Sequence, residues 1–245
     1  MTFKEKFLSY GFATIDNIYT ADEIENILQI INQANRDKET FRKSADLFAI
    51  RQFFRDIPET LAIVFNDNLK SVLRELPGDK YFVVKSIYFD KPQTSNWYVS
   101  YHQDLTISVD KKYELKGFQC WTKKQNQFAV QPPLHILQNI VTIRIHLDET
   151  DQNNGALKVV PKSHLKGIYR PETINWSVEE GVTCNVSKGG IMLMKPLLLH
   201  SSGRTTNNNQ RRVIHVEFSN RELPLGLNWS ERIELNIFQD DCSFP

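Results

Sequence analysis

The hydrophobic pattern of the chain changes its period near residue 78. Before that point apolar residues follow helical spacing, at Ile24, Ile27, Leu28 and Ile31. Thr20-Ala-Asp-Glu23 precedes this run as a capping box, which marks a helix start. Further helical turns are expected to begin near Pro58 and to end before Pro77-Gly78. The pattern therefore predicts a helical flank over about residues 20–76.

Beyond residue 78 the pattern is typical of strands. Residues 81–90 are rich in aromatic and β-branched side chains, and residues 140–147 alternate apolar with polar positions. Shorter strands are expected at residues 11–15, 97–109, 156–160, 181–186, 190–194 and 211–218. Helices followed by many short strands predict a mainly β protein, a sandwich or barrel with flanking α-helices, and not a parallel α/β sheet. The barrel core is placed at about residues 81–220.

Two stretches show neither period. Residues 35–44 are too polar to bury much surface and are expected to form a loop. Residues 110–135 contain Pro132-Pro133 and the scattered lysines Lys111, Lys112, Lys116, Lys123 and Lys124. Long irregular segments inside compact domains are usually functional, so residues 110–135 are a candidate lid.

Composition limits the classes of protein that fit. A chain of 245 residues with 24% charged and 40% hydrophobic residues is expected to form one globular domain, residues 1–245. Its formal charge of +1 gives no electrostatic reason to expect nucleic acid or an anionic membrane as a partner. Three unevenly spaced cysteines and the lack of a long apolar stretch favour a cytoplasmic protein with reduced thiols.

The first candidate chemistry is His102-Gln103-Asp104. Residues two apart on a strand point to the same face, so His102 and Asp104 are able to offer an imidazole and a carboxylate to one metal ion. Two histidines and one carboxylate on one side of a metal form the facial triad of non-heme Fe(II) oxygenases. On spacing alone, an ordinary ion pair on a surface strand explains the two residues equally well. A second histidine from elsewhere in the chain is required.

His200 is the preferred third ligand. It ends the apolar run Leu197-Leu198-Leu199 at an expected strand end, before a polar, turn-rich stretch. The other histidines are expected to be core, strand or turn residues, namely His135, His146, His164 and His215. Arg211 follows His200 by eleven residues and is expected to bind a carboxylate through its guanidinium. Arg212 competes for this role, because alternation lets only one of the two face the metal.

This set of residues resembles the phytanoyl-CoA dioxygenase family of Fe(II)- and 2-oxoglutarate-dependent oxygenases. Besides His102-x-Asp104, His200 and Arg211, the likeness rests on three stretches: Asn96-Trp97, residues 151–164 and Pro196-Leu-Leu-Leu-His200-Ser-Ser-Gly. It covers roughly residues 10–220. One departure is Lys162, at a place before Ser163-His164 where this family commonly has glycine.

The resemblance implies a double-stranded β-helix, a cupin-like jelly roll with the metal at one end of the barrel. It implies that His102, Asp104 and His200 hold Fe(II) and that Arg211 holds the C5 carboxylate of 2-oxoglutarate. Two further candidates for contacts to this cosubstrate are Lys85 and Ser202, although a surface lysine and a turn hydroxyl are the commoner roles of such residues. Three aromatic residues are candidates for the substrate pocket or for packing: Trp97, Tyr98 and Trp121.

The resemblance also implies a reaction. With O₂, the enzyme would oxidise a small organic molecule and convert 2-oxoglutarate to succinate and CO₂. Relatives that halogenate have a small residue in place of the carboxylate, so Asp104 indicates hydroxylation or another oxidation. A CoA thioester as substrate would need a basic groove for its phosphates, for which the lysines of residues 110–135 are candidates. The alternative function is a jelly-roll protein that binds small molecules without catalysis, or a metal-dependent isomerase.

Overall fold

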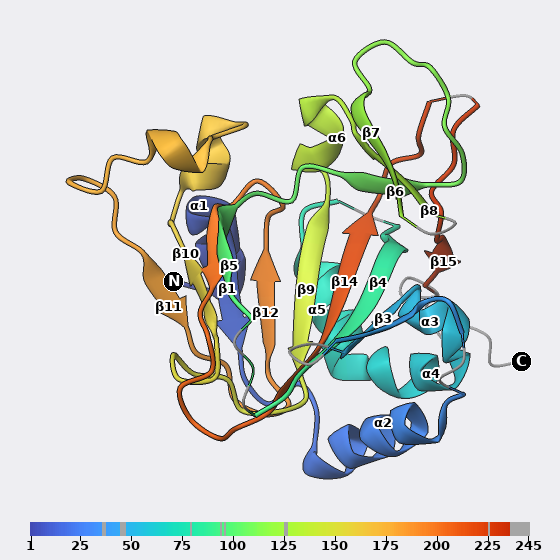
Figure 1. Ribbon diagram of the computed structural model, residues 1–245, viewed down its shortest axis with the longest axis vertical. Helices are drawn as coiled ribbons and strands as arrows, with labels where there is room; N and C mark the ends of the chain where they lie inside the picture. The colour runs from blue at the N-terminus through green and yellow to red at the C-terminus, as the bar shows by residue number, and fades with distance from the viewer. Residues whose placement is uncertain are drawn as a thin grey trace, which may run out of the picture.

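Antiparallel strands form the centre of the molecule, and helices cover one side of it (Figure 1). The computed structural model describes residues 1–35, 38–44, 48–78, 80–93, 95, 97–124, 127–224 and 226–235. Asn96 of the predicted motif and Cys242 lie outside these residues. Within the described part of the chain, no helix is both long and apolar enough to cross a membrane.

The larger sheet has the strand order β1-β12-β9-β14-β4-β3-β2, and β15 also pairs with β4. Its strands are β1 (Phe12–Ile15), β2 (Phe41–Lys43), β3 (Phe48–Arg51), β4 (Phe82–Lys91), β9 (Val141–His146), β12 (Ile191–Met194), β14 (Arg211–Ser219) and β15 (Ile233–Glu234). The long strands β4 and β14 pair along nearly their full length and form the middle of the sheet.

The smaller sheet has the order β11-β10-β13-β5. Its strands are β5 (Val99–His102), β10 (Leu157–Val159), β11 (Val182–Cys184) and β13 (His200–Ser202). A third sheet, β6-β8-β7, lies beyond one end of the larger sheet (Figure 1). It is formed by β6 (Ile107–Val109), β7 (Gln119–Lys124) and β8 (Gln127–Gln131).

The helices lie mainly in the first third of the chain, as predicted. They are α1 (Phe3–Tyr10), α2 (Ala21–Gln33), α3 (Phe53–Asp56), α4 (Leu61–Val64), α5 (Asp67–Glu75) and α6 (Leu134–Gln138), with 3₁₀ turns at Pro58–Thr60, Ser163–Lys166 and Pro171–Thr173. The predicted capping box is present: the Thr20 hydroxyl accepts from the Glu23 amide, and the Glu23 carboxylate accepts from the Thr20 amide.

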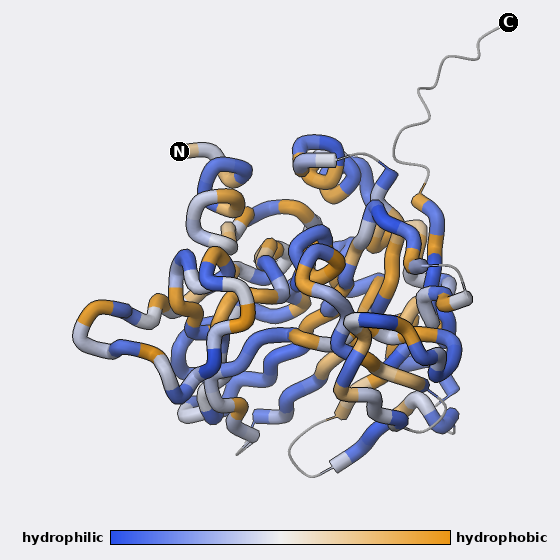
Figure 2. The backbone as a smooth tube through the Cα atoms, turned by 90° about the horizontal axis from the view of Figure 1, so that it is seen from above, coloured by the Kyte–Doolittle hydropathy of each residue, from blue (hydrophilic) through white to orange (hydrophobic). Residues whose placement is uncertain are grey.

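The main core lies between the helices and the larger sheet. Even-numbered residues of β14, such as Ile214 and Phe218, pack with Ile24, Ile27 and other residues of the helices. Each fully buried aliphatic side chain of this kind contributes about 1.5–3 kcal/mol. On the opposite face of the sheet, β14 turns Arg211, His215 and Glu217 toward the smaller sheet. Figure 2 shows hydrophobic and hydrophilic residues interspersed along the backbone.

Three expected elements differ from the structure. Residues 35–44, expected to form a loop, include β2, which pairs antiparallel with β3. The expected strand at 97–109 is divided into β5 and β6, with irregular backbone at residues 103–106. Residues 110–135, expected to be irregular, contain β7 and β8. The polar residues and lysines in these short strands obscure the period of two.

The departure at Lys162 has a visible backbone consequence. Lys162 has φ 66°, in the left-handed region that favours glycine. Its ammonium lies over the Tyr10 ring, 5.5 Å from the centroid. A lysine therefore occupies a backbone conformation that glycine adopts without steric cost.

Candidate active site

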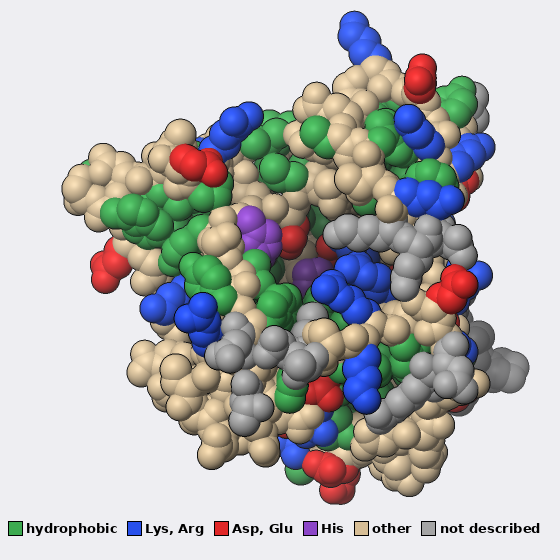
Figure 3. Space-filling model, viewed as in Figure 1, with side chains coloured by type: hydrophobic (Ala, Val, Ile, Leu, Met, Phe, Trp, Pro, Cys, Tyr) green, Lys and Arg blue, Asp and Glu red, His purple; other side chains and the backbone are tan. Residues whose placement is uncertain are grey.

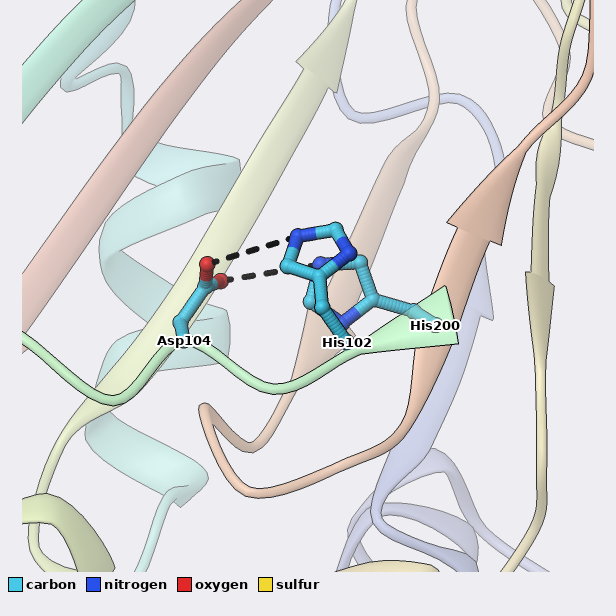
Figure 4. A group of neighbouring side chains, drawn as sticks. All are labelled: His102, Asp104 and His200. Carbon is cyan, nitrogen blue, oxygen red and sulfur yellow. Dashed lines mark ion pairs between the residues drawn. The ribbon is translucent and has the colours of Figure 1, made fainter. Parts of the chain in front are cut away.

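Three predicted residues meet where the smaller sheet faces the larger one. His102 ends β5 and His200 begins β13, and the two are partners in the antiparallel register. Asp104 follows His102 by two residues, and Figure 4 shows its carboxylate directed at both imidazoles. One ligand atom from each of the three residues lies within 4.8 Å of the others. The predicted constellation is therefore assembled, although His200 begins a strand where a strand end was expected.

Hydrogen bonds fix which nitrogen of each imidazole faces the carboxylate. His102 Nδ1 lies 2.9 Å from the Ser100 carbonyl oxygen, and His200 Nδ1 lies 2.9 Å from that of Leu198. A carbonyl only accepts, so each Nδ1 carries a proton, and in the neutral form of each imidazole the lone pair of Nε2 is left for a metal ion. This arrangement orients metal-binding histidines in many proteins.

The distances between these groups fit a cation and not direct hydrogen bonds. His102 Nε2 lies 3.9 Å from Asp104 Oδ1, and His200 Nε2 lies 3.7 Å from Asp104 Oδ2. Both distances exceed the usual length of a hydrogen bond. Two imidazole lone pairs and a carboxylate around one point form the N₂O donor set suited to Fe(II).

The charge states suit this role. Burial lowers the pKa of His200 to about 4, so its imidazole is neutral near pH 7. Burial also disfavours the charged form of Asp104, but the nearby His200, His215, Lys85 and His102 outweigh it and lower the pKa of Asp104 to about 2. Near pH 7, Asp104 and His200 therefore already have the protonation states that bind a metal ion.

Gln103 holds the backbone of this site in place. It points away from the metal position, and its amide nitrogen donates to the carbonyls of Leu197, at 2.5 Å, and Gly167, at 2.8 Å. Its amide oxygen accepts from the Tyr169 backbone N–H at 2.8 Å. From the sequence, no role in the chemistry was assigned to Gln103. In the structure it ties the His102-Asp104 segment to the chain just before His200.

A cleft of about 400 Å³ opens beside the three residues. Figure 3 shows histidine and acidic side chains inside the hollow and basic side chains along its edge. The lining comes from both sheets: Arg42, Ala49, Arg51, Lys85, Ile87, Phe89, Trp97, Val99, His102, Asp104, Arg144, Leu157, His200, Ser201, Ser202, Arg211, His215 and Glu217. The cleft is thus polar on the face that β14 turns toward the smaller sheet.

Arg211 lies in this cleft as predicted and is buried, with 3% of its surface exposed. Its Nη1 donates to the Gly155 carbonyl at 2.5 Å, whereas its buried Nε has no hydrogen-bond partner in the described structure. Burial, and then the charge of Arg144, lower the pKa of Arg211 to about 9. A buried guanidinium with an unused donor fits the distal carboxylate of 2-oxoglutarate.

The competing Arg212 has a different role. It points to the opposite face and forms a bidentate pair with Asp148, with Nη2–Oδ1 2.6 Å and Nε–Oδ2 2.8 Å. The alternation of β14 therefore separates the two arginines as the sequence predicted. Arg212 does not line the cleft.

Of four other candidate residues, three line the cleft and one does not. Ser202 lies on β13 in the cleft, and its hydroxyl donates to the Gly155 carbonyl at 3.0 Å. Lys85 also faces the cleft, and its ammonium lies 2.7 Å from the Glu217 carboxylate. Trp97 lines the cleft, whereas Trp121 packs in a separate cluster that includes Phe128.

Three arginines of the cleft were not singled out from the sequence. Arg144 is buried on β9, its Nη1 lies 3.2 Å from His215 Nδ1, and its buried Nε lacks a partner in the described structure. The polar face of the 140–147 alternation was the available signal for Arg144. Arg42 and Arg51 lie on β2 and β3, where no strand was clearly predicted.

Comparison with known proteins agrees with the geometry. The family model described as "Phytanoyl-CoA dioxygenase (PhyH)" matches residues 7–213. The chain belongs to the phytanoyl-CoA dioxygenase family. It is accordingly an Fe(II)- and 2-oxoglutarate-dependent oxygenase, which confirms the predicted enzyme class and cofactors. The family match does not support the alternative of a protein without oxygenase activity.

Curated relatives of this phytanoyl-CoA dioxygenase family member are distant. A probable alpha-ketoglutarate-dependent hypophosphite dioxygenase of Stutzerimonas stutzeri is 21% identical and covers 88% of this chain and 77% of its own. A phytanoyl-CoA dioxygenase domain-containing protein 1 homolog of Caenorhabditis elegans is 22% identical, with coverage of 94% and 93%. Identity at this level leaves the substrate open.

Solved structures confirm the fold of this family member. EctD from S. alaskensis, solved with 2-oxoglutarate and 5-hydroxyectoine, matches with a TM-score of 0.67 at 18% identity, covering 88% of this chain and 74% of its own. SnoN, a non-heme alpha ketoglutarate dependent epimerase from nogalamycin biosynthesis, matches with a TM-score of 0.65 at 12% identity, with coverage of 89% and 81%. The predicted double-stranded β-helix is thereby confirmed.

Proposed function

We propose that the enzyme hydroxylates a small organic molecule, with His102, Asp104 and His200 as the Fe(II) ligands. The observation that carries this assignment is the pair of Nε2 atoms that lie near one carboxylate while each Nδ1 is held by a backbone carbonyl. Bound Fe(II) and 2-oxoglutarate supply the activation of O₂. One oxygen atom enters the C–H bond of the substrate, and the other enters succinate as CO₂ is released.

Arg211 is proposed to bind the C5 carboxylate of 2-oxoglutarate. The Ser202 hydroxyl, whose single proton is donated to the Gly155 carbonyl in this structure, is proposed to turn and donate to that carboxylate when the cosubstrate binds. Both residues lie on the Gly155 side of the cleft, where each donates to the Gly155 carbonyl. The partnerless Nε of Arg211 provides the additional donor for a carboxylate. Arg144 is a second buried cation near this end, and its charge further favours a dianionic cosubstrate.

Lys85 is placed in the same cleft but is engaged by Glu217. We propose that its main contribution is to compensate this buried carboxylate, and that Arg211 anchors 2-oxoglutarate. His215 also lies near Glu217, with Nε2–Oε1 at 3.2 Å. Lys85, Glu217 and His215 thus form a hydrogen-bonded network, which holds these three side chains in fixed orientations in the cleft.

Asp104 supports an oxygenation outcome. Its carboxylate completes the ligand set, so the position that a halide takes in halogenating relatives is filled by the protein. The relatives act, by their names, on different compounds or catalyse different reactions, including epimerisation. The substrate must therefore be sought by experiment.

A metabolite screen read out by succinate release tests this proposal. The purified enzyme is incubated with Fe(II), 2-oxoglutarate and O₂ and with each small molecule in turn, and Asp104→Ala serves as the inactive control. The proposal predicts succinate above the uncoupled background for at least one compound, together with a product heavier by one oxygen atom. Succinate formation by Asp104→Ala at the wild-type rate would contradict the assignment of Asp104.

A further inference from the structure

The cleft carries more positive charge than iron and 2-oxoglutarate require. Among the described residues, five cationic side chains line it, Arg42, Arg51, Lys85, Arg144 and Arg211, against the two carboxylates Asp104 and Glu217. Without the histidines, these seven side chains have a formal charge of +3. The charges of Fe(II) and of 2-oxoglutarate cancel, so the same excess remains after both have bound. A cleft of one sign concentrates ligands of the other sign.

The cations form two groups separated by β4. Arg144 and Arg211 lie on β9 and β14. Arg42 and Arg51 lie on β2 and β3, where Arg42 pairs with Ala49 in register and Arg51 pairs with Ile87 of β4. Because neighbouring strands are about 4.8 Å apart, the backbones of β3 and β14 are roughly 10 Å apart. A carboxylate bound by Arg211 is therefore too far away to contact Arg42 and Arg51 as well. We call Arg42 and Arg51 the outer pair.

The outer pair has no anionic partner in the described part of the chain. Neither the Arg42 nor the Arg51 guanidinium forms a hydrogen bond or ion pair with a described residue, whereas Arg212 and Lys85 each have one. The nearby Asp56 carboxylate already accepts from Thr40 and lies 3.7 Å from the Lys38 ammonium. Burial and the charge of Arg42 lower the pKa of Arg51, so an anion between the two would relieve their repulsion.

An apolar wall lies beside the outer pair. Ala49, Ile87, Phe89 and Trp97 form one packed cluster, and the Phe89 and Trp97 ring centroids are 6.3 Å apart. All four residues line the cleft. A ligand at this place would meet an apolar surface on one side and two guanidinium groups at one end. This combination fits an organic anion and disfavours a neutral or cationic molecule.

We propose that Arg42 and Arg51 bind an oxyanion group, a carboxylate or a phosphate, of the organic substrate. The apolar part of the substrate packs on Phe89 and Trp97, which leaves a C–H bond directed at the metal position. This inference rests on the proposed function, because it assigns the Arg211 end of the same cleft to 2-oxoglutarate.

Calorimetric titration without O₂ tests the inference with three probes of equal chain length: hexanoate, hexyl phosphate and 1-hexanol. The protein is first loaded with Fe(II) and 2-oxoglutarate, so that Arg211 is occupied. The wild type is expected to bind at least one anion about tenfold or more tightly than hexanol, since charge-assisted hydrogen bonds contribute to the anion alone. The preferred anion identifies the oxyanion class.

Substitutions of Arg42 and Arg51 test whether these residues cause the preference for an anion over hexanol. Arg42→Gln, Arg51→Gln and the double variant are expected to lose most of the preference while their affinity for 2-oxoglutarate stays within about twofold. Arg51→Lys is expected to keep part of it. Arg221→Gln is the matched control, because Arg221 is exposed and does not line the cleft. Unchanged thermal unfolding shows that each variant is folded.

The outcomes separate this inference from the proposed function. Wild-type protein that takes up Fe(II) and 2-oxoglutarate but binds hexanol as tightly as both anions overturns only the assignment of Arg42 and Arg51. A double variant that keeps the full anion preference also overturns it. Wild-type protein that takes up neither Fe(II) nor 2-oxoglutarate overturns the proposed function and, with it, the inference.

Discussion

His102 and His200 face each other across two neighbouring antiparallel strands, with ring centroids 4.2 Å apart. Residues almost a hundred positions apart in the chain are thus held by the strand register itself. The register fixes the spacing of the imidazoles, and the Nδ1 hydrogen bonds fix their orientation. Asp104 lies on irregular backbone after β5, so the strand register does not hold it and other contacts must fix its position.

Gln103→Ala is expected to weaken Fe(II) binding by about ten- to a hundredfold, as is typical when a residue that supports metal ligands is lost. The variant removes three hydrogen bonds that hold the segment carrying His102 and Asp104, but it removes no ligand. Competition with a chromophoric chelator measures the affinity. Gln138→Ala is the control, because Gln138 is exposed. An unchanged affinity in Gln103→Ala would show that the segment is rigid without this side chain.

Arg211→Gln and Arg212→Gln are expected to have opposite effects. Arg211→Gln should lower the affinity for 2-oxoglutarate about tenfold or more, because it removes a charge-assisted hydrogen bond in a buried place. Arg212→Gln should leave this affinity unchanged and cost at most about 1 kcal/mol of stability, because its pair with Asp148 is partly exposed. Anaerobic titration with 2-oxoglutarate measures the first effect and urea denaturation the second. Equal losses of affinity in both variants would contradict the assignment.

Acid is expected to destabilise the protein through His146. Burial, followed by the charges of Arg144 and Arg211, holds the pKa of His146 well below its ordinary value of 6.5. Above pH 6.5 the residue is neutral in both states, and its full contribution to stability is present. As the pH falls below 6.5 the unfolded chain takes up a proton that the folded chain does not, so stability falls by up to about 1.4 kcal/mol per pH unit.

His146→Gln should make this dependence shallower, whereas His135→Gln, at an exposed position, should not. Urea denaturation of the metal-free protein at several pH values between 7 and 5 measures the slope. A slope in His146→Gln as steep as that of the wild type would exclude His146 as its source.

Lys85→Met is expected to destabilise the fold by about 3 kcal/mol or more, because it leaves the buried Glu217 carboxylate without its cation. Lys85→Met combined with Glu217→Gln should recover most of this loss, since no charge is then left unpaired. Urea denaturation of the two single variants and the double variant completes the cycle. Purely additive losses would show that the pair is not coupled.

The sequence predicted those parts of the site that depend on the alternation of side chains along a single strand. Spacing of two placed His102 and Asp104 together, and the alternation of residues 211–218 separated Arg211 from Arg212. Neither pattern determines which distant strands pair, so the contact of His102 with His200 came only from the choice among histidines and from the family resemblance. The position of His200 at the start of β13 was not visible in the apolar run before it.

The arginines on β2 and β3 escaped prediction for a physical reason. β2 is three residues long and carries two charged residues, so it has no usable apolar alternation. It is stabilised by pairing with β3, which in turn pairs with β4. Such tertiary pairing overrides weak local propensity. Residues 110–135 show the same effect, because the lysine-bearing β7 is held by β8.

The most direct test of the four-residue site is the anaerobic addition of Fe(II) and 2-oxoglutarate to the metal-free protein. Chelation of Fe(II) by 2-oxoglutarate in the site produces a weak visible charge-transfer band. The wild type is expected to show this band, Asp104→Ala to lose it, and Arg211→Gln to need about tenfold more 2-oxoglutarate to form it. A wild type with no band and no metal uptake, or an undiminished band in Asp104→Ala, would contradict the assignment of His102, Asp104, His200 and Arg211.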